Sequence, residues 1–344
     1  MPRRLVALVA LLALFALHGP ARAEKNLIRP PGTTRYGAMV EQLQALRRYD
    51  QSHSKQMTLS PVGTSVKGRS LWLVTVKAAS EDGAAAKVSP EDRATAPKKV
   101  LYICRQHGHE PASTEAALAF LTQLVKAEDG SALAGELTRA TVYVIPMANP
   151  DGAEAFRRHN AHDADMNRDW LRRTQPETRA LYQTLLRLHP DFVTDQHELY
   201  PNDTHPDFLE IVGSGSGATP AFAAKLEDER TTVQNVMQAE GFPAGRITDT
   251  DTHPARLAHR WISLKLGIPT VLFETPRLNG TGRTVASRAA AHKEFMLTML
   301  RYASGDSDAM LAEVQAWRDK QTVPVTPTLT APPTDPTPGD ETAP

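Results

Sequence analysis

Two histidines and a glutamate stand close together in the segment RQHGHEPAS, residues 105–113. Within it, His107 and Glu110 are three positions apart, and two such side chains on a tight turn can converge on one metal ion. His109 is adjacent to Glu110 and is expected to point elsewhere. The segment therefore indicates part of a metal site, with His107 and Glu110 as its ligands.

Two further polar groups end apolar segments downstream. Asp195 and His197 end one of them, and Glu274 ends another. Two histidines and one carboxylate make a three-ligand zinc set that leaves a fourth position for water. A carboxylate beside such a metal can take the proton from zinc-bound water, which makes Glu274 a candidate general base. Each group by itself is commonplace, because strand-end histidines are usually surface or hydrogen-bonded residues and the HxxE spacing also occurs by chance.

Apolar segments that read as strands alternate with segments of helical spacing. Continuous Val, Ile and Leu runs suit strands that are buried on both faces, so the pattern predicts one α/β domain with a mixed, mostly parallel sheet flanked by helices. Ligands in such sheets bind at the carboxyl ends of strands, where the polar groups above fall. The predicted strands are 70–76, 99–105, 141–147, 191–197, 208–213 and 270–275, and the predicted helices are 115–125, 176–188, 222–239 and 284–302.

Composition excludes several classes of protein. The chain has 344 residues, of which 41% are hydrophobic, so it can bury a substantial core. Its 39 basic and 39 acidic residues balance, so neither nucleic acid nor an anionic membrane is an implied partner. Cys104 is the only cysteine. A disulfide framework is thereby excluded, and stability must come from a core or a bound metal.

The two ends of the chain differ from its body. Residues 1–23 carry Arg3 and Arg4, then an apolar run, then Ala21–Arg22–Ala23, which is the pattern of a cleaved signal peptide. The run is short for a membrane span, so an exported, periplasmic or extracellular protein with no integral membrane association after cleavage is expected, with an uncleaved anchor as the alternative. Residues 322–344 are rich in Pro and Thr and read as a disordered tail, which leaves 24–321 as the catalytic domain.

The ordered set of motifs resembles the zinc carboxypeptidase family. That family carries HxxE, an NPDG segment, Arg-x-Asn, an Asn-Arg pair, a single histidine and a late glutamate. Over about residues 36–302, this chain presents them in the same order, preceded by GTSVKGRSLWLV at 63–74, which is similar to the family's early strand and turn. The NPDG segment, 149–152, reads most simply as a turn, because Pro and Gly constrain its backbone. The motifs are HGHE at 107–110, NPDG, RHN at 158–160, NRDW at 167–170, His197 and Glu274.

The resemblance implies a role for each matched residue at the centre. His107, Glu110 and His197 correspond to the ligands of one zinc ion per chain, and His109 does not bind. Glu274 corresponds to the general base that deprotonates the zinc-bound water and then passes the proton to the leaving amine. Arg158, preferred to Arg157 because it alone has the Arg-x-Asn spacing, corresponds to the arginine that stabilises the oxyanion. Asp195 and Glu198, which flank the third ligand, are candidates to orient it.

Substrate residues follow from the same resemblance. Asn167 and Arg168 correspond to the pair that grips the terminal carboxylate of a peptide, a task that suits a planar guanidinium. Arg69 either reaches a more distant substrate position or is a structural residue of its turn. His259 falls near the floor of the pocket for the terminal side chain, and with Arg256 and Arg260 it favours polar or acidic terminal residues, including those of cell-wall peptides.

One departure from the family concerns the loop tyrosine that closes over substrate in its digestive members. Between Tyr200 and Tyr302 this chain has no tyrosine, so closure must differ here. The motifs together imply an exported zinc metallocarboxypeptidase acting on peptides with a free C-terminal carboxylate. Two alternatives stay open: a zinc-dependent deacylase of N-acylated amino acids or cell-wall peptides on the same fold, and a catalytically silent peptide-binding module.

Overall fold

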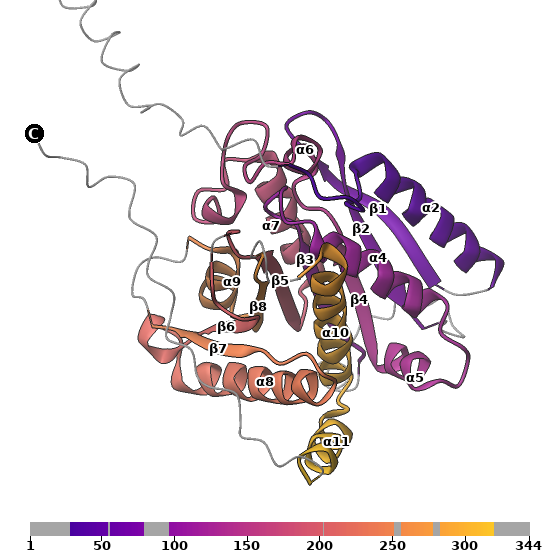
Figure 1. The fold of residues 1–344 in the computed structure, drawn as a ribbon, viewed down its shortest axis with the longest axis vertical. Coiled ribbons are helices and arrows are strands. Elements are labelled where there is room, and N and C mark those ends of the chain that lie inside the picture. Colours follow the sequence, from indigo (N-terminus) through magenta and orange to yellow (C-terminus); the bar gives the residue numbers. More distant parts are fainter. Residues whose placement is uncertain are drawn as a thin grey trace, which may run out of the picture.

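A single mixed sheet of eight strands forms the centre of the described part of the chain in this computed structural model (Figure 1). The structure describes residues 28–53, 56–78, 96–201, 203–250, 256–277 and 283–319. The strand order is β1-β2-β4-β3-β5-β8-β6-β7, and the central strands β4, β3, β5 and β8 all run parallel. The expected α/β fold with a mixed, mostly parallel sheet is confirmed. The expected signal peptide, 1–23, and tail, 322–344, lie outside the described residues.

All six predicted strands are present, with ends that differ by at most two residues from the prediction. Two edge strands do not follow from the apolar pattern. One of them, β1, contains Pro61 and Gly63, residues that weaken a strand, and its pairing with β2 shifts register between them. The other, β7, is short and mostly polar in sequence. The bounds are β1 Gln56–Thr64, β2 Ser70–Lys77, β3 Lys98–Cys104, β4 Ala140–Ile145, β5 Phe192–Glu198, β6 Phe208–Val212, β7 Gly245–Asp249 and β8 Thr270–Thr275.

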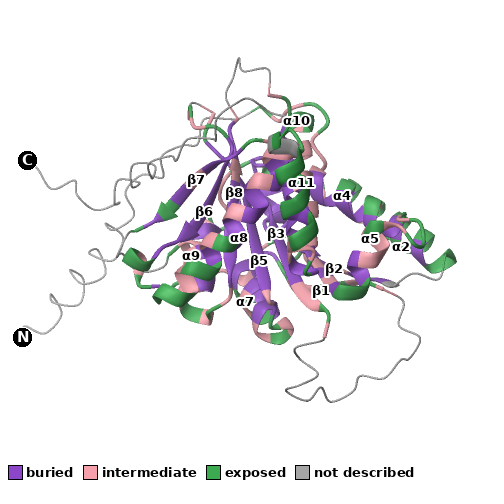
Figure 2. Cartoon of the chain, turned by 90° about the horizontal axis from the view of Figure 1, so that it is seen from below, coloured by how far each residue is buried: buried purple, intermediate pink, exposed green. Residues whose placement is uncertain are grey.

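Helices cover both faces of the sheet. The larger core packs α2 (Tyr36–Ser52), α4 (Ala112–Val125), α8 (Pro220–Ala239) and α10 (Val285–Ala303) on one face. A smaller core on the other face receives α7 (Pro176–Leu188), α9 (Ala258–Trp261) and the π-helical segment Ile262–Leu266. Figure 2 shows the result, with buried strands between helices whose outer sides are exposed. The shorter helices are α5 (Ala132–Arg139), α6 (Pro150–Ala155) and α11 (Ser307–Asp319), and single 3-10 turns span Met166–Arg168 and Ser214–Ser216.

Local sequence explains where the predicted helices begin. Pro176 opens α7, where its missing N–H is not needed. Thr219 and Thr284 cap α8 and α10, each accepting a hydrogen bond from a backbone N–H three residues on. The unpredicted helix α2 is polar over most of its surface, and its buried apolar residues are Met39, Leu43 and Leu46. So narrow a stripe gives little periodic signal in the sequence.

The central strands are buried on both faces, as their apolar sequences predict. In β5 every residue is buried, and in β3 only the first two are partly exposed. Tyr102 of β3 donates its hydroxyl to the backbone carbonyl of Met296 in α10, which satisfies a polar group inside the core. Burying one large apolar side chain contributes about 1.5–3 kcal/mol, so these two strands anchor both cores. Among the described residues, no helix is both long and apolar enough to cross a bilayer.

A buried carboxylate in α8 makes stability depend on pH. Glu229 is fully buried, and within the described residues neither of its carboxylate oxygens has a hydrogen-bond partner. Burial raises its pKa from 4.5 to about 8. The folded state therefore binds this proton more tightly than the unfolded state does. The free energy of unfolding should fall as pH rises from about 4.5 to 8, with a limiting slope of about 1.4 kcal/mol per pH unit.

Glu229→Gln removes this titration, so its stability relative to the unsubstituted protein should be higher at pH 8 than at pH 5. Urea unfolding at the two pH values measures the difference. Glu240→Gln, at an exposed position just past the end of the same helix, is the matched control and should behave alike at both values. An equal effect of Glu229→Gln at pH 5 and pH 8 would contradict the prediction.

Candidate active site

The segment that follows β3 is held in a fixed shape by buried contacts. Arg105 directly follows the strand with φ 57°, in the left-handed region, and its Nε donates to the carbonyl of Gly108 three residues on. Gly108 lies against the NPDG segment so closely that an added Cβ would be 2.0 Å from the carbonyl carbon of Gly152. No other residue type fits that position. The close packing fixes where the flanking His107 and Glu110 point.

The NPDG segment is not a turn, which corrects the expectation. It is the beginning of α6: the side chain of Asn149 caps the helix by accepting from the N–H of Gly152, and Pro150 occupies the first turn. The same side chain donates through Nδ2 to the carbonyls of Gln106 and Arg158. Asn149 thus ties together the HxxE loop and the segment that carries Arg158.

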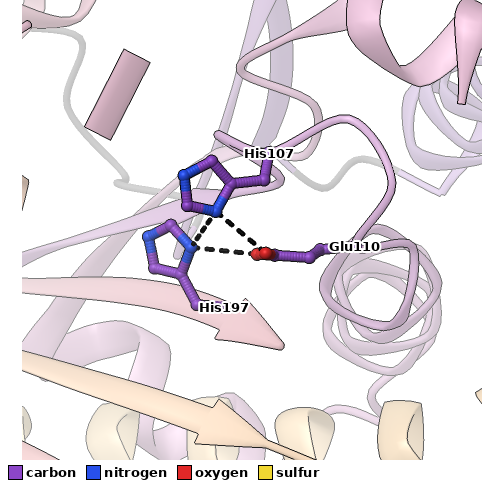
Figure 3. Close-up of side chains that lie close together, drawn as sticks. All are labelled: His107, Glu110 and His197. Carbon is purple, nitrogen blue, oxygen red and sulfur yellow. Dashed lines mark hydrogen bonds and ion pairs between the residues drawn. The ribbon is translucent and has the colours of Figure 1, made fainter. Parts of the chain in front are cut away.

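The three predicted metal ligands converge (Figure 3). His107 and Glu110 come from the loop between β3 and α4, and His197 from the carboxyl-terminal part of β5. The Nδ1 of His107 is 2.9 Å from Glu110 Oε1, the Nδ1 of His197 is 3.0 Å from Glu110 Oε2, and the two Nδ1 atoms are 3.1 Å apart. All three residues are buried. This is the spacing of donor atoms around one small cation.

The outer nitrogens of both histidines face carboxylates. His107 Nε2 is 3.0 Å from Asp165 Oδ1, and His197 Nε2 is 3.0 Å from Asp195 Oδ1. A carboxylate at Nε2 favours the tautomer with the proton there, which leaves the Nδ1 lone pairs directed at each other and at Glu110. Facing lone pairs repel unless a cation lies between them. The donor set of two imidazoles and a carboxylate fits Zn²⁺.

Of the two acids that flank His197, one orients it and the other does not. Asp195 makes the contact described above, as expected. Glu198 instead accepts from the backbone N–H of Ala112 and from Arg288 Nε, so it joins β5 to α4 and α10. His109 lies outside the converging group, with its Nε2 3.4 Å from Arg277 Nη2. Burial, reinforced by the charge of Arg277, lowers its pKa to about 2.

Glu274 lies next to His197 because of strand register. The two residues are direct partners on the parallel strands β8 and β5, so their side chains leave the same face of the sheet. Glu274 is partly exposed, and none of the described residues forms a hydrogen bond with its carboxylate. Burial raises its pKa to about 8, with Glu110 and Glu210 adding to the rise and His197 and Arg158 opposing it. The pKa of such a carboxyl falls beside a bound cation, toward the range useful to a general base.

Arg158 lies beside the metal ligands, and Arg157 does not. Arg158 Nε donates to Asp165 Oδ2 at 2.9 Å, and its Nη1 is 3.7 Å from Glu110 Oε1. Burial would lower the pKa of Arg158, but Asp165 and Glu110 raise it, so the guanidinium stays charged. Arg157 pairs with Asp163 at the surface. The structure thus brings the expected arginine, and not its neighbour, to the site.

Asn167 and Arg168 occupy different surroundings. Asn167 is buried, and its Oδ1 accepts from the backbone N–H of Ala258. The oxygen end of its amide is therefore engaged by the protein, and its Nδ2 lies 3.2 Å from His197 Nε2. Arg168 is partly exposed, and its charge lowers the pKa of Asp165. Of the two residues, Arg168 is the more exposed.

Arg69 and His259 are both engaged by carboxylates of the protein. Arg69 Nη1 is 2.6 Å from Asp151 Oδ1, an ion pair that joins the turn after β1 to the start of α6, which is the structural alternative considered for it. His259 is fully buried, with Nε2 3.1 Å from Glu210 Oε1, so the expectation that it forms the accessible floor of a substrate pocket does not hold. The adjacent Arg260 pairs with Glu210 and Asp249, at 3.1 and 2.8 Å.

The sequence did not predict Asp165 or Gln106, which hold the histidine ligands in place through hydrogen bonds on the side away from the metal site. Asp165 contacts both His107 and Arg158, yet nothing in the sequence separates it from Asp163, two positions earlier. A second support runs from Trp170 Nε1 to Gln106 Oε1 at 2.9 Å and from Gln106 Nε2 to Asp195 Oδ1 at 2.7 Å. The one available signal was position, since Asp165 lies two residues before the Asn-Arg motif and Gln106 directly precedes HxxE.

Comparison with known proteins agrees with this geometry. Residues 42–197 match the sequence model of the zinc carboxypeptidase family. The chain is 32% identical over 106 residues to probable carboxypeptidase 2 of Trichophyton verrucosum (strain HKI 0517), a stretch covering 31% of this chain and 20% of that protein. It is 28% identical over 158 residues to zinc carboxypeptidase of Saccharothrix mutabilis subsp. capreolus, covering 44% and 32%. A metallo-carboxypeptidase structure from Burkholderia cenocepacia matches with a TM-score of 0.63 at 21% identity, covering 78% of this chain and 69% of that one.

The resemblance expected from the motifs is confirmed over residues 42–197, the stretch that matches the zinc carboxypeptidase family. Zinc, the metal in the description of that family, suits the donor set of His107, Glu110 and His197, which lie together. The aligned stretches span a fifth to a third of the length of the two curated relatives. The family match ends at His197, so Glu274 lies beyond it, and its assignment depends on the register of β5 and β8.

Asp165→Asn should weaken zinc binding, because the amide lacks the charge that holds the proton on His107 Nε2. Loss of such outer partners typically lowers metal affinity about 10- to 100-fold. Competition with a chromophoric zinc chelator measures the affinity. The matched control is Asp163→Asn in the same loop, whose carboxylate binds Arg157 and His159 at the surface. Equal zinc affinities for the two variants would contradict the assignment of Asp165.

Proposed function

We propose that the protein is a zinc metallocarboxypeptidase that hydrolyses the C-terminal bond of a peptide with a free carboxylate. The observation that carries the proposal is the register that places Glu274 beside His197, on the same face as the three converging ligands. A base positioned next to a catalytic metal is the arrangement of metal-assisted hydrolysis. A catalytically silent peptide-binding module has no use for a partly exposed carboxylate at that point.

The surroundings of each residue indicate its role in the proposed reaction. When bound at His107, Glu110 and His197, zinc supplies a Lewis acid that polarises a carbonyl and makes water more acidic. Glu274 accepts the proton of the attacking water and then transfers it to the leaving amine, since its carboxylate is the one that lies next to the ligands without a hydrogen-bond partner among the described residues.

Arg158 supplies charge where the peptide oxygen becomes negative. Its guanidinium is fixed by Asp165 before substrate arrives, so little reorganisation is needed during the reaction. Arg168 donates to the terminal carboxylate of the substrate, for which its planar fork of N–H groups is suited. Asn167 contributes by holding the start of α9 in place beside His197.

The same motifs leave open a related reaction, removal of an acyl group from an N-acylated amino acid, since its product also carries a free carboxylate. Turnover of acylated amino acids but not of peptides would favour that reaction. We also propose export to the periplasm or the extracellular space, on the pattern of residues 1–23, with cell-wall peptides as candidate substrates. Cell fractionation, with the mature N-terminus sequenced, tests the location.

Glu274→Gln should abolish most peptide turnover while zinc stays bound, because the amide cannot accept the proton. Loss of a general base typically costs about 10²- to 10⁴-fold in rate. Turnover of a C-terminally unblocked peptide is measured beside zinc content by elemental analysis. The control is Glu41→Gln, at an exposed position in α2. Full activity of Glu274→Gln would remove the residue from the mechanism, and an inactive unsubstituted protein would favour the binding module.

The charged residues expected near the pocket for the terminal side chain differ in their surroundings. Arg260 pairs with two carboxylates, Glu210 and Asp249. Glu210 is buried and also lies 3.1 Å from His259 Nε2, so the charges of this group offset one another. Arg256 is exposed. We therefore base the proposed preference for polar or acidic terminal residues on Arg256.

Peptides that differ only in a terminal Lys, Glu or Phe test this proposal. The kcat/KM for the Glu peptide should exceed that for the Phe peptide, and Arg256→Gln should reduce the ratio, because the attraction of the guanidinium is lost. The ratio does not depend on how much of the variant is folded. Cleavage of the Phe peptide as fast as the Glu peptide would overturn the charge argument.

A further inference from the structure

Tyr200 stacks on the arginine of the site. The guanidinium carbon of Arg158 lies over the Tyr200 ring, 5.1 Å from its centroid. Tyr200 follows the ligand His197 by three positions, just past the end of β5. The ring is 46% exposed, which makes it one of the few large aromatic side chains of the described chain that reach the surface. An exposed ring needs a reason to stay there, and the stacked cation supplies one.

The Tyr200 ring covers one face of the Arg158 guanidinium, whose edge already contacts carboxylates. Asp165 binds Nε of Arg158, Glu110 lies 3.7 Å from Nη1, and the side chain of Arg158 is only 11% exposed. Edge contacts with carboxylates fix the direction of the side chain but leave rotation of its plane less restricted. A ring over the face restricts that rotation and keeps water from one side of the cation. Cation–π attraction is stronger where the cation is so desolvated.

We propose that Tyr200 is a positioning residue that holds the guanidinium plane of Arg158 toward the reacting carbonyl. This inference rests on the proposed function, since it concerns the arginine assigned to the oxyanion. Tyr200 acts through Arg158 and not by contact with the substrate. Its ring face is the part that matters, and its hydroxyl is dispensable.

The arrangement is specific to this pair. Arg173 stacks on Tyr182 and Trp261, and Lys126 lies over Tyr49, but none of these cations contacts the metal ligands. Tyr49 is 37% exposed, which makes it a matched control for the loss of an exposed tyrosine that covers a cation. Because Tyr200 lies outside the core, its substitution should leave the fold and the zinc content unchanged.

The test compares Tyr200→Phe, Tyr200→Leu and Tyr49→Leu in zinc-loaded protein with a C-terminally unblocked peptide. Tyr200→Leu should lower kcat about 3- to 30-fold, the range that corresponds to one cation–π contact, with KM changed less than about 2-fold. Tyr200→Phe should restore activity to within about 2-fold of the unsubstituted protein, and Tyr49→Leu should have no effect. In an Arg158→Ala background, Tyr200→Leu should cause no further loss, because the two residues act as one unit.

Three outcomes would overturn the proposal: unchanged kcat in Tyr200→Leu, a rise in KM with kcat unchanged, or an equal loss with and without Arg158. A second measurement does not need activity. The Nε–H signal of Arg158 in ¹⁵N NMR, identified by its absence in Arg158→Ala, should exchange faster with water in Tyr200→Leu but not in Tyr200→Phe. An unsubstituted protein that cleaves no peptide would contradict the proposed function, while the NMR comparison would still decide the contact.

Discussion

The close approach of two buried histidines and a buried glutamate is the constraint on which the rest of the structure depends. The Nδ1 atoms of His107 and His197 lie 3.1 Å apart with Glu110 against both, inside the protein and away from water. A cation bound among these donor atoms would stabilise the cluster, and the fold must hold the atoms close together whether or not one is bound. One ligand pair comes from a loop and the third ligand from a neighbouring strand, and the parallel pairing of β3 with β5 keeps them together.

Much of the surrounding sequence serves this arrangement. Asn149 ties the HxxE loop to the segment of Arg158, and Gly108 allows α6 to approach where any side chain would clash. Asp165 links His107 to Arg158 through its two oxygens, so a candidate metal ligand and the arginine proposed to stabilise the oxyanion are positioned by one carboxylate. Many motif residues are buried because they hold one another in position through direct contacts.

The predicted strands and helices were those whose apolar residues face a core on one or both sides. The edge strand β1 escaped prediction because Pro61 and Gly63 are tolerated only at a sheet edge, and the sequence does not say which strand is at the edge. The NPDG segment reads as a turn in isolation, and it starts a helix because Asn149 can cap it. The pairing of charged side chains was the least predictable property. Arg260, for example, pairs with two acids that lie 50 and 11 positions away in the chain.

By itself the sequence determined the alternation of strands and helices, the residue types of the zinc site and the order of the motifs that carry them. These features depend on spacing along the chain and on the chemistry of each side chain, which the sequence states directly. Tertiary structure alone decided that Glu274 stands beside His197, that Asp165 and not Asp163 supports the ligands, and that Tyr200 covers Arg158. Those contacts depend on strand register and loop packing, which are set by the summed burial of the whole core and not by any local pattern.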